Sequence, residues 1–305
     1  MVSVGKWVQK VTRALEESNL FYGHGTDNPR DEAAWLVLHA ANAPLDGSFN
    51  DWNRPLSAAE GTLVLANLAE RIERGMPLAY ILGSAWFAGL EFEVDKSVLV
   101  PRSPIAELIF EHFQPWAGAP AINKVLDLCT GSGCIGIAIA WHMPWVTVDA
   151  SDISPAALAV ARRNVRKHRL EPRVQVYQSD LFTALRGKTY DLVVTNPPYV
   201  ARETMLELPR EYHAEPELGL VSGTDGLDAC LQILAQAPHY LTDGGMLVCE
   251  VGESEQRLVG ALPGVPFVWP EFSNGGAGVF ILSRQDLLQA APLIMNVIKE
   301  REHVT

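Results

Sequence analysis

The chain has 305 residues, and 24 lysines and arginines against 36 acidic residues give it a formal net charge of −12. Hydrophobic residues make up 48% and charged residues 20%, which is typical of globular proteins and excludes disordered and fibrous classes. The acidic balance argues against a nucleic-acid coat or a binder of anionic membranes, while it permits a basic protein partner.

The four cysteines form no C-x-x-C pair and have no cluster of histidines beside them. We therefore expect no disulfide framework, no metal site and a reducing, cytoplasmic environment. The basic residues near the N-terminus are not followed by an apolar run, so no signal peptide is expected. No uninterrupted apolar stretch approaches the roughly 18 residues that cross a bilayer, so no membrane span is expected either.

Residues 1–82 are predicted to form a small helical domain. Asn28-Pro29 matches a helix N-cap followed by proline at the first helical position, and apolar residues follow at helical spacing. Ser57 and Glu60 form a capping-box pattern ahead of a long amphipathic run. The domain carries no titratable cluster, so we expect it to recognise a substrate rather than to catalyse a reaction.

A β-hairpin and a connecting helix are predicted over residues 83–115. The segment WFAGLEFEV alternates roughly with period two, Asp95-Lys96 supplies a turn signal, and SVLV is expected to return as a strand. Pro101 breaks this strand, and Ser103 is expected to cap a helix that has Pro104 at its first position.

Strands and helices alternate in the remainder, residues 116–305. The apolar strand segments are KVLDL, VTVDAS, RVQVYQ, DLVVT, GMLVCEV, PFVW and GVFIL, and the first two helices are CIGIAIAWH and AALAVARRNVRKH. Such strands separated by helices predict an α/β domain with a parallel sheet covered on both faces. Ligands of these sheets bind outside the carboxyl ends of the strands, so polar motifs at those ends mark the candidate site.

A glycine-rich turn joins the first of these strands to the first helix. It contains, in order, Asp127, Cys129, Thr130, Gly131, Gly133 and Gly136. The G-x-G-x-x-G spacing lets the backbone approach a ligand without a Cβ in the way. Asp152 ends the next strand, where a carboxylate can accept hydrogen bonds from both ribose hydroxyls. The motif predicts a nucleotide-like ligand, and by itself it leaves NAD possible.

Asp180 and Leu181 follow the third strand, at the same edge of the sheet. A carboxylate at this place could meet an adenine amino group, and Leu181 with Phe182 would give apolar walls. The spacing equally allows Asp180 to be a plain helix N-cap.

The segment Asn196-Pro197-Pro198-Tyr199 directly follows the fourth strand. Its two prolines fix the backbone and remove donors, which leaves the Asn196 side-chain oxygen and the Pro197 carbonyl as acceptors side by side. Two acceptors suit a planar NH2 group, and holding both hydrogens aims the nitrogen lone pair at an electrophile. Tyr199 is expected to stack on the planar group and to exclude water.

The order of glycine motif, ribose carboxylate, Asp180 and Asn-Pro-Pro-Tyr resembles the class I S-adenosylmethionine-dependent methyltransferases that act on NH2 groups. Adenine-specific DNA methyltransferases and HemK-like protein glutamine methyltransferases share it. A helical N-terminal domain, the hairpin segment and VLVPR, in this order, are similar to the HemK-like family over essentially the whole chain. The resemblance implies a Rossmann-like seven-stranded sheet, S-adenosyl-L-methionine as cofactor and S-adenosyl-L-homocysteine as product.

Within that family the chain is similar to the PrmB subgroup, which methylates a glutamine of the third protein of the large ribosomal subunit. Ser103-Pro104 after Pro-Arg differs from the usual release-factor methyltransferases, and residues 213–220 and 222–227 also fit this subgroup. The expected partner is that ribosomal protein, without direct DNA binding. Cys129 stands where the family usually has glycine, and the turn is expected to survive because cysteine is small.

The candidate site residues form two overlapping sets. Cofactor binding is expected from Asp127, Cys129, Thr130, Gly131, Gly133, Asp152, Asp180, Leu181 and Asn196. Substrate binding is expected from Arg102, Asn196, Pro197, Pro198 and Tyr199, of which Asn196, Pro197 and Tyr199 are the catalytic candidates. The expected mechanism needs no general base and works mainly by orientation, which can contribute about 7–11 kcal/mol. His213 is the alternative as a base, and Glu250 is expected to be structural or to bind water.

Four other interpretations are weighed against this one. A release-factor glutamine methyltransferase would not have Ser103-Pro104, and a DNA adenine methyltransferase would need a basic groove. An NAD-dependent oxidoreductase has no use for Asn-Pro-Pro-Tyr, and a non-catalytic ribosome-assembly binder would not need intact motifs. Residues 201–222 lack clear periodicity and are expected to cover the glutamine-bearing segment.

Overall fold

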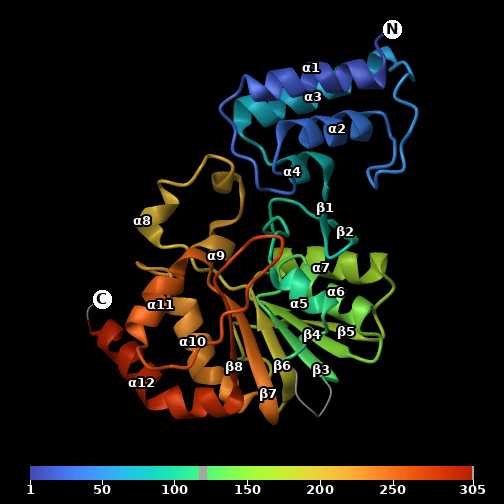
Figure 1. Cartoon of the computed structure of the whole chain (residues 1–305). Coiled ribbons are helices and arrows are strands. Elements are labelled where there is room, and N and C mark those ends of the chain that lie inside the picture. The colour runs from blue at the N-terminus through green and yellow to red at the C-terminus, as the bar shows by residue number, and fades with distance from the viewer. Residues whose placement is uncertain (117–121, 304–305) are drawn as a thin grey trace.

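The computed structural model describes residues 1–116 and 122–303, and the predictions for residues 117–121 and 304–305 lie outside this described part. The first helices form the small domain at the top of Figure 1: α1 (Val4–Glu16), α2 (Pro29–Ala40), α3 (Ala58–Arg74) and α4 (Leu78–Leu82). The side chains of Asn28 and Ser57 cap α2 and α3, and Glu60 completes the expected capping box. Buried aliphatic residues of these helices form a core of their own.

The hairpin lies earlier in the chain than predicted. β1 (Ser84–Phe87) pairs antiparallel with β2 (Leu90–Glu93), and their turn is Ala88-Gly89 rather than Asp95-Lys96. Both turn residues have positive φ, 47° and 77°, as a two-residue turn matched to twisted strands requires. The expected return strand SVLV does not form. The alternation of apolar and polar residues indicates a hairpin. It does not locate the turn, because alanine at the first turn position is not a typical turn residue.

The larger domain is built on a six-stranded sheet in the order β5-β4-β3-β6-β7-β8. The strands are β3 (Lys124–Leu128), β4 (Thr147–Asp152), β5 (Val174–Gln178), β6 (Tyr190–Thr195), β7 (Leu241–Glu250) and β8 (Val279–Ser283). The sheet is mixed rather than parallel throughout, because β8 runs antiparallel to β7. The predicted strand PFVW is reduced to one bridge between Val268 and Ile281. Prolines at 266 and 270 flank it and lack the N–H groups that a longer ladder needs.

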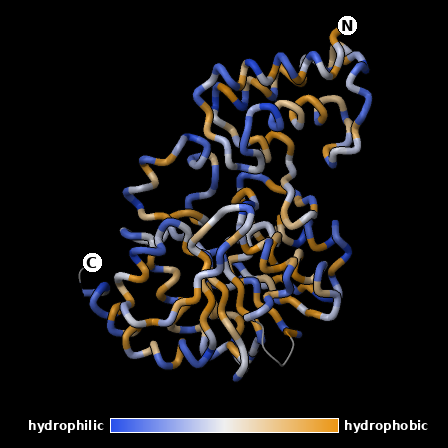
Figure 2. Tube along the Cα trace, in the orientation of Figure 1, coloured by the Kyte–Doolittle hydropathy of each residue, from blue (hydrophilic) through white to orange (hydrophobic). Residues whose placement is uncertain are grey.

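Helices cover both faces of this sheet (Figure 1), and alternate strand residues belong to the two cores on either side of it. Val125 and Val194 share a core with α5 (Ile105–Phe110), α6 (Cys134–His142) and α7 (Pro155–Lys167). Leu126 and Val193 belong to a second core with α10 (Asp228–Gln236), α11 (Glu255–Ala261) and α12 (Arg284–Glu302). Figure 2 shows the resulting concentration of apolar residues along the central strands. The cores fix the strands whose carboxyl ends carry the polar motifs.

The segment 201–222 lies between the helical domain and the sheet in Figure 1. It contains α8 (Arg202–Met205), η1 (Tyr212–Ala214) and α9 (Glu217–Leu220), while η2 (Ala237–His239) and η3 (Gly252–Ser254) flank β7. Arg71 of α3, 2% exposed, joins this segment to the helical domain by pairing with Glu32 and, at 2.9 Å, with Glu211. No helix in the described part of the chain is long and apolar enough to cross a membrane.

Candidate active site

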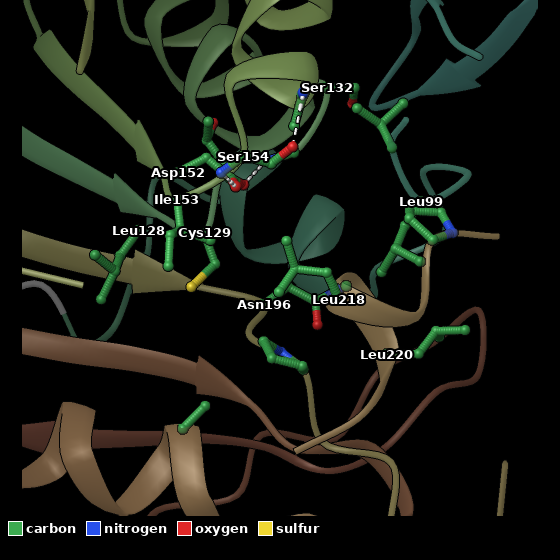
Figure 3. Close-up of a pocket in the computed structure, with 18 of the residues that line it drawn as sticks. Leu99, Leu128, Cys129, Ser132, Asp152, Ile153, Ser154, Asn196, Leu218 and Leu220 are labelled. Atoms are coloured by element: carbon green, nitrogen blue, oxygen red, sulfur yellow. Dashed lines mark hydrogen bonds between the residues drawn. The ribbon is translucent and has the colours of Figure 1, made fainter. Parts of the chain in front are cut away.

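A cavity of about 390 Å³ lies at the carboxyl ends of the parallel strands (Figure 3). Its walls come from the turns after β3 to β6, the end of β7, residues 97–103 and α9. They include most of the predicted site residues: Arg102, Cys129, Thr130, Gly131, Asp152, Asp180, Leu181, Asn196, Pro198 and Tyr199. Asp127, Gly133 and Pro197 lie outside this lining.

Asp127 lies beneath the glycine turn rather than in the cavity wall. Its carboxylate accepts a hydrogen bond from the Thr130 hydroxyl and another, at 2.8 Å, from the Gly136 backbone N–H. A Cβ at position 136 would lie 2.8 Å from the same carboxylate, so only glycine allows this contact. Burial raises the pKa of Asp127 to about 7, against the lowering effect of its two donors. Through these contacts Asp127 orients the turn, and its assignment to cofactor binding stays a prediction.

Asp152 holds the glycine turn from the neighbouring strand (Figure 3). One carboxylate oxygen accepts from the Gly131 N–H and the other from the Ser154 N–H, both at 2.9 Å. Each oxygen keeps a second lone pair for hydroxyl groups of a ligand. A Cβ added to Gly131 would meet no atom within 4 Å, so a ligand has open space in front of the backbone there.

Asp180 and Leu181 lie in the cavity wall beyond the end of β5. Asp180 is exposed, and its carboxylate accepts no hydrogen bond within residues 1–116 and 122–303. The residues after it form a turn rather than a helix, so the helix-cap alternative is wrong. The Leu181 carbonyl accepts from the Ser179 hydroxyl at 2.5 Å, which holds this turn against the cavity.

The Asn196-Pro197-Pro198-Tyr199 segment follows β6 directly. The Asn196 side-chain oxygen is buried and accepts no hydrogen bond from the described part of the chain. The Tyr199 hydroxyl donates to Glu250 at 3.1 Å, and the Tyr199 carbonyl accepts from the Ser254 hydroxyl at 2.8 Å. Burial and the charge of Glu250 raise the pKa of Tyr199, so the phenol keeps its proton. A buried acceptor such as the Asn196 oxygen is costly unless a ligand supplies a donor.

Arg102 reaches the cavity wall from the segment before α5. Its guanidinium donates two hydrogen bonds of 2.7 Å to the Glu215 carboxylate. The guanidinium carbon also lies over the Tyr212 ring, 5.3 Å from the ring centroid. Glu215 also accepts from the Val100 N–H at 2.9 Å and lies 3.4 Å from the His24 ring nitrogen. Arg102 therefore ties residues 201–222 to the wall, and its assignment to substrate binding stays a prediction.

Sequence reasoning assigned Glu250 a structural or water-binding role and gave no role to Glu215. Glu250 lies in the cavity wall, is 6% exposed and accepts hydrogen bonds from two hydroxyls. A charged residue at the carboxyl end of an apolar strand is a usable signal for such a position. Glu215 gives no comparable signal, because its partner Arg102 lies 113 residues earlier. His213 is exposed and does not line the cavity.

The fold and the cavity together define a class I methyltransferase. The hMettl16 catalytic domain, solved in complex with MAT2A 3′UTR hairpin 6, is similar with a TM-score of 0.50, covering 81% of this chain and 92% of that one. At 16% sequence identity this similarity concerns the fold alone. The methyltransferase small domain model matches residues 105–210, and the PrmC N-terminal domain model matches residues 6–83.

Two relatives define the family more closely. A ribosomal protein uL3 glutamine methyltransferase of Xanthomonas campestris pv. campestris is 48% identical over 291 residues, which cover 95% of this chain and 94% of the relative. Another of the same description, from Francisella tularensis subsp. tularensis, is 44% identical over 276 residues, covering 90% and 88%. The chain belongs to this family of protein glutamine methyltransferases, which confirms the resemblance drawn from the motifs.

Proposed function

We propose that this chain transfers a methyl group from S-adenosyl-L-methionine to the side-chain amide nitrogen of a glutamine in ribosomal protein uL3. The observation that carries the chemistry is the buried Asn196 oxygen in the cavity wall, an acceptor for which the described residues provide no donor. A glutamine NH2 group supplies the donor, and the Pro197 carbonyl is the second acceptor in this proposal. The protein substrate is inferred from the two relatives and from Ser103-Pro104.

The chemistry of the cavity wall fits S-adenosyl-L-methionine. Asp152 would bind the ribose hydroxyls, and the open space at Gly131 accommodates the amino-acid end of the cofactor. The exposed Asp180 carboxylate in the cavity wall suits an adenine amino group, beside the apolar Leu181. When bound, this cofactor supplies a methyl group that its positively charged sulfur makes electrophilic.

The residues of the chain orient the amide rather than activate it with a base, because the proton that leaves the nitrogen becomes acidic only as the N–C bond forms and the C–S bond breaks. An amide nitrogen is a poor nucleophile because its lone pair is delocalised, and acceptors on both hydrogens aim that lone pair at the methyl group. Tyr199, fixed through its hydroxyl and its carbonyl, provides a wall that excludes water. His213 is outside the cavity lining, which supports a mechanism without it as a base.

The proposal is tested by incubating the enzyme with labelled S-adenosyl-L-methionine and either purified uL3 or a purified release factor. Mass spectrometry should locate the label on a glutamine amide of uL3, and Asn196→Ala should abolish most of it. Labelling of the release factor alone would assign the chain to the other glutamine methyltransferases. Labelling of neither protein would overturn the proposed function.

A further inference from the structure

Glu250 lies beside the proposed acceptor site at the edge of the sheet. β6 and β7 are parallel neighbours, and Thr195 pairs with Cys249. Asn196 and Glu250 are therefore the next residues along the two strands, and both line the cavity. Glu250 is 6% exposed, so its carboxylate is a buried group that needs polar partners.

Two hydroxyl groups donate hydrogen bonds to this carboxylate. The Tyr199 hydroxyl bonds one oxygen at 3.1 Å, and the Ser103 hydroxyl bonds the other at 2.5 Å. Asn196 follows the strand next to Glu250, and its side-chain amide lowers the pKa of this carboxylate. Burial raises the pKa of Glu250, while Ser103, Tyr199, the charge of Arg102 and Asn196 lower it. With donors on both oxygens, Glu250 acts as an acceptor in this arrangement.

An acceptor beside Asn196 determines which end of its amide faces the cavity. The oxygen and the NH2 group of an asparagine have nearly the same shape, and only their hydrogen-bond partners distinguish them. A carboxylate accepts from the NH2 group and repels the oxygen. The oxygen is then left without a partner, as observed. In the opposite orientation an NH2 group would face the substrate NH2 group, and two donors cannot bond each other.

We propose that Glu250 is a positioning residue that fixes the Asn196 amide with its oxygen toward the substrate glutamine. The inference rests on the proposed function and adds a residue to it. Ser103 helps to fix Glu250 in turn. Its hydroxyl donates to the Glu250 carboxylate and accepts from the Ile105 N–H at 3.2 Å, which connects Glu250 to the start of α5. Ser103 is also the position at which the chain departs from the release-factor pattern.

Glu250→Gln tests the idea with almost no change in shape. A glutamine side chain can donate as well as accept, so it no longer imposes one orientation on Asn196. We expect kcat to fall about 10- to 100-fold, as for the loss of a hydrogen bond to a charged group, and cofactor Kd to change less than about 3-fold. Glu253→Gln, the same change at an exposed position three residues later, should leave kcat unchanged.

A double-mutant cycle separates positioning from a general structural effect. In an Asn196→Ala background there is no amide to orient, so adding Glu250→Gln should lower kcat by less than about 3-fold further. Equal losses in both backgrounds, or a Glu250→Gln enzyme with wild-type kcat, would overturn the inference. Thermal unfolding of each variant checks that it is folded. If wild-type enzyme does not methylate glutamine at all, the proposed function fails instead, so the two failures are distinguishable.

Discussion

Two glycines pack closely against Tyr199, which is also fixed by the hydrogen bonds of its hydroxyl and its carbonyl. A Cβ added to Gly226 would lie 2.2 Å from the Tyr199 carbonyl oxygen, and one added to Gly252 would lie 2.7 Å from its ring. These glycines are far from Asn-Pro-Pro-Tyr in the sequence. The motif therefore predicts which residues form the acceptor site, but the residues that fix its geometry become visible only in the fold.

Gly226→Ala should disturb this site in two ways. Gly226 has φ of 88°, which is unfavourable for alanine, and the new methyl group would also collide with a backbone carbonyl. Gly187→Ala is the matched control, because Gly187 has φ of 79° with no atom within 4 Å of an added Cβ. We expect Gly226→Ala to lower the free energy of unfolding by about 1–3 kcal/mol more than the control. Urea unfolding measures the difference, and equal losses would contradict the role of Tyr199 packing.

Asp152→Ala should weaken cofactor binding without removing the fold. Loss of hydrogen bonds to a charged group costs about 1.5–3 kcal/mol, so Kd for S-adenosyl-L-methionine should rise roughly 10- to 150-fold. Asp149 is a control on the same strand, because it pairs with Lys188 at 2.7 Å and does not line the cavity. Calorimetry should show near wild-type affinity for Asp149→Ala. Equal weakening by both substitutions would remove Asp152 from the ribose site.

Elements in the middle of the sheet were predictable, and those at its margins were not. β3 and α6 have the bounds that their apolar runs suggest, because both are buried by neighbouring elements on each side. The hairpin and the expected seventh strand pack against fewer neighbouring elements. The position of the hairpin therefore depends on its turn at Ala88-Gly89, and prolines prevent the seventh strand from forming. The same holds for the site: the contiguous glycine turn and Asn-Pro-Pro-Tyr were predictable, whereas the bond from Ser103 to Glu250 spans 147 residues.

Two buried acidic residues attach the segment 201–222 to the rest of the chain. Glu211 pairs with Arg71 of the helical domain, and Glu215 pairs with Arg102 of the cavity wall. Burial alone would raise the pKa of Glu215, but hydrogen bonds and charge from His24 and Arg102 lower it to about 2. The folded state therefore favours the ionised form of Glu215.

The stability that Glu215 contributes should depend on pH in a defined direction. Its pKa in the folded chain, about 2, lies below the ordinary value of 4.5, so the contribution is complete above pH 4.5 and is lost as the pH falls toward 2. The pKa difference corresponds to about 3 kcal/mol. Urea unfolding should show that wild type has a higher free energy of unfolding than Glu215→Gln at pH 5, and that this difference becomes smaller as the pH falls to 2. Glu203→Gln, an exposed control in this segment, should change stability by less than about 0.5 kcal/mol at pH 7.

At the scale of the whole molecule, the net charge of −12 favours association with positively charged surfaces, such as one on the proposed protein substrate. Long-range attraction between opposite charges speeds association and weakens with salt, because the Debye length falls as ionic strength rises. Raising salt from about 50 to about 300 mM should raise KM for uL3 several-fold and leave kcat nearly unchanged. Steady-state kinetics at both salt concentrations measure this. A salt-independent KM would show that the charge balance has no part in recognition.

The pairing of Arg71 also has a consequence for synthesis on the ribosome. Arg71 can meet Glu32 as soon as the N-terminal helices have emerged, but Glu211 follows 140 residues later. At roughly 5–20 residues per second, translation needs about 7–28 s to supply it. During this interval the nascent helical domain carries an arginine with only one of its two carboxylate partners. The domain acquires this ion pair only when the segment beyond Asn-Pro-Pro-Tyr docks, so the pairing of Arg71 is completed together with one wall of the active site.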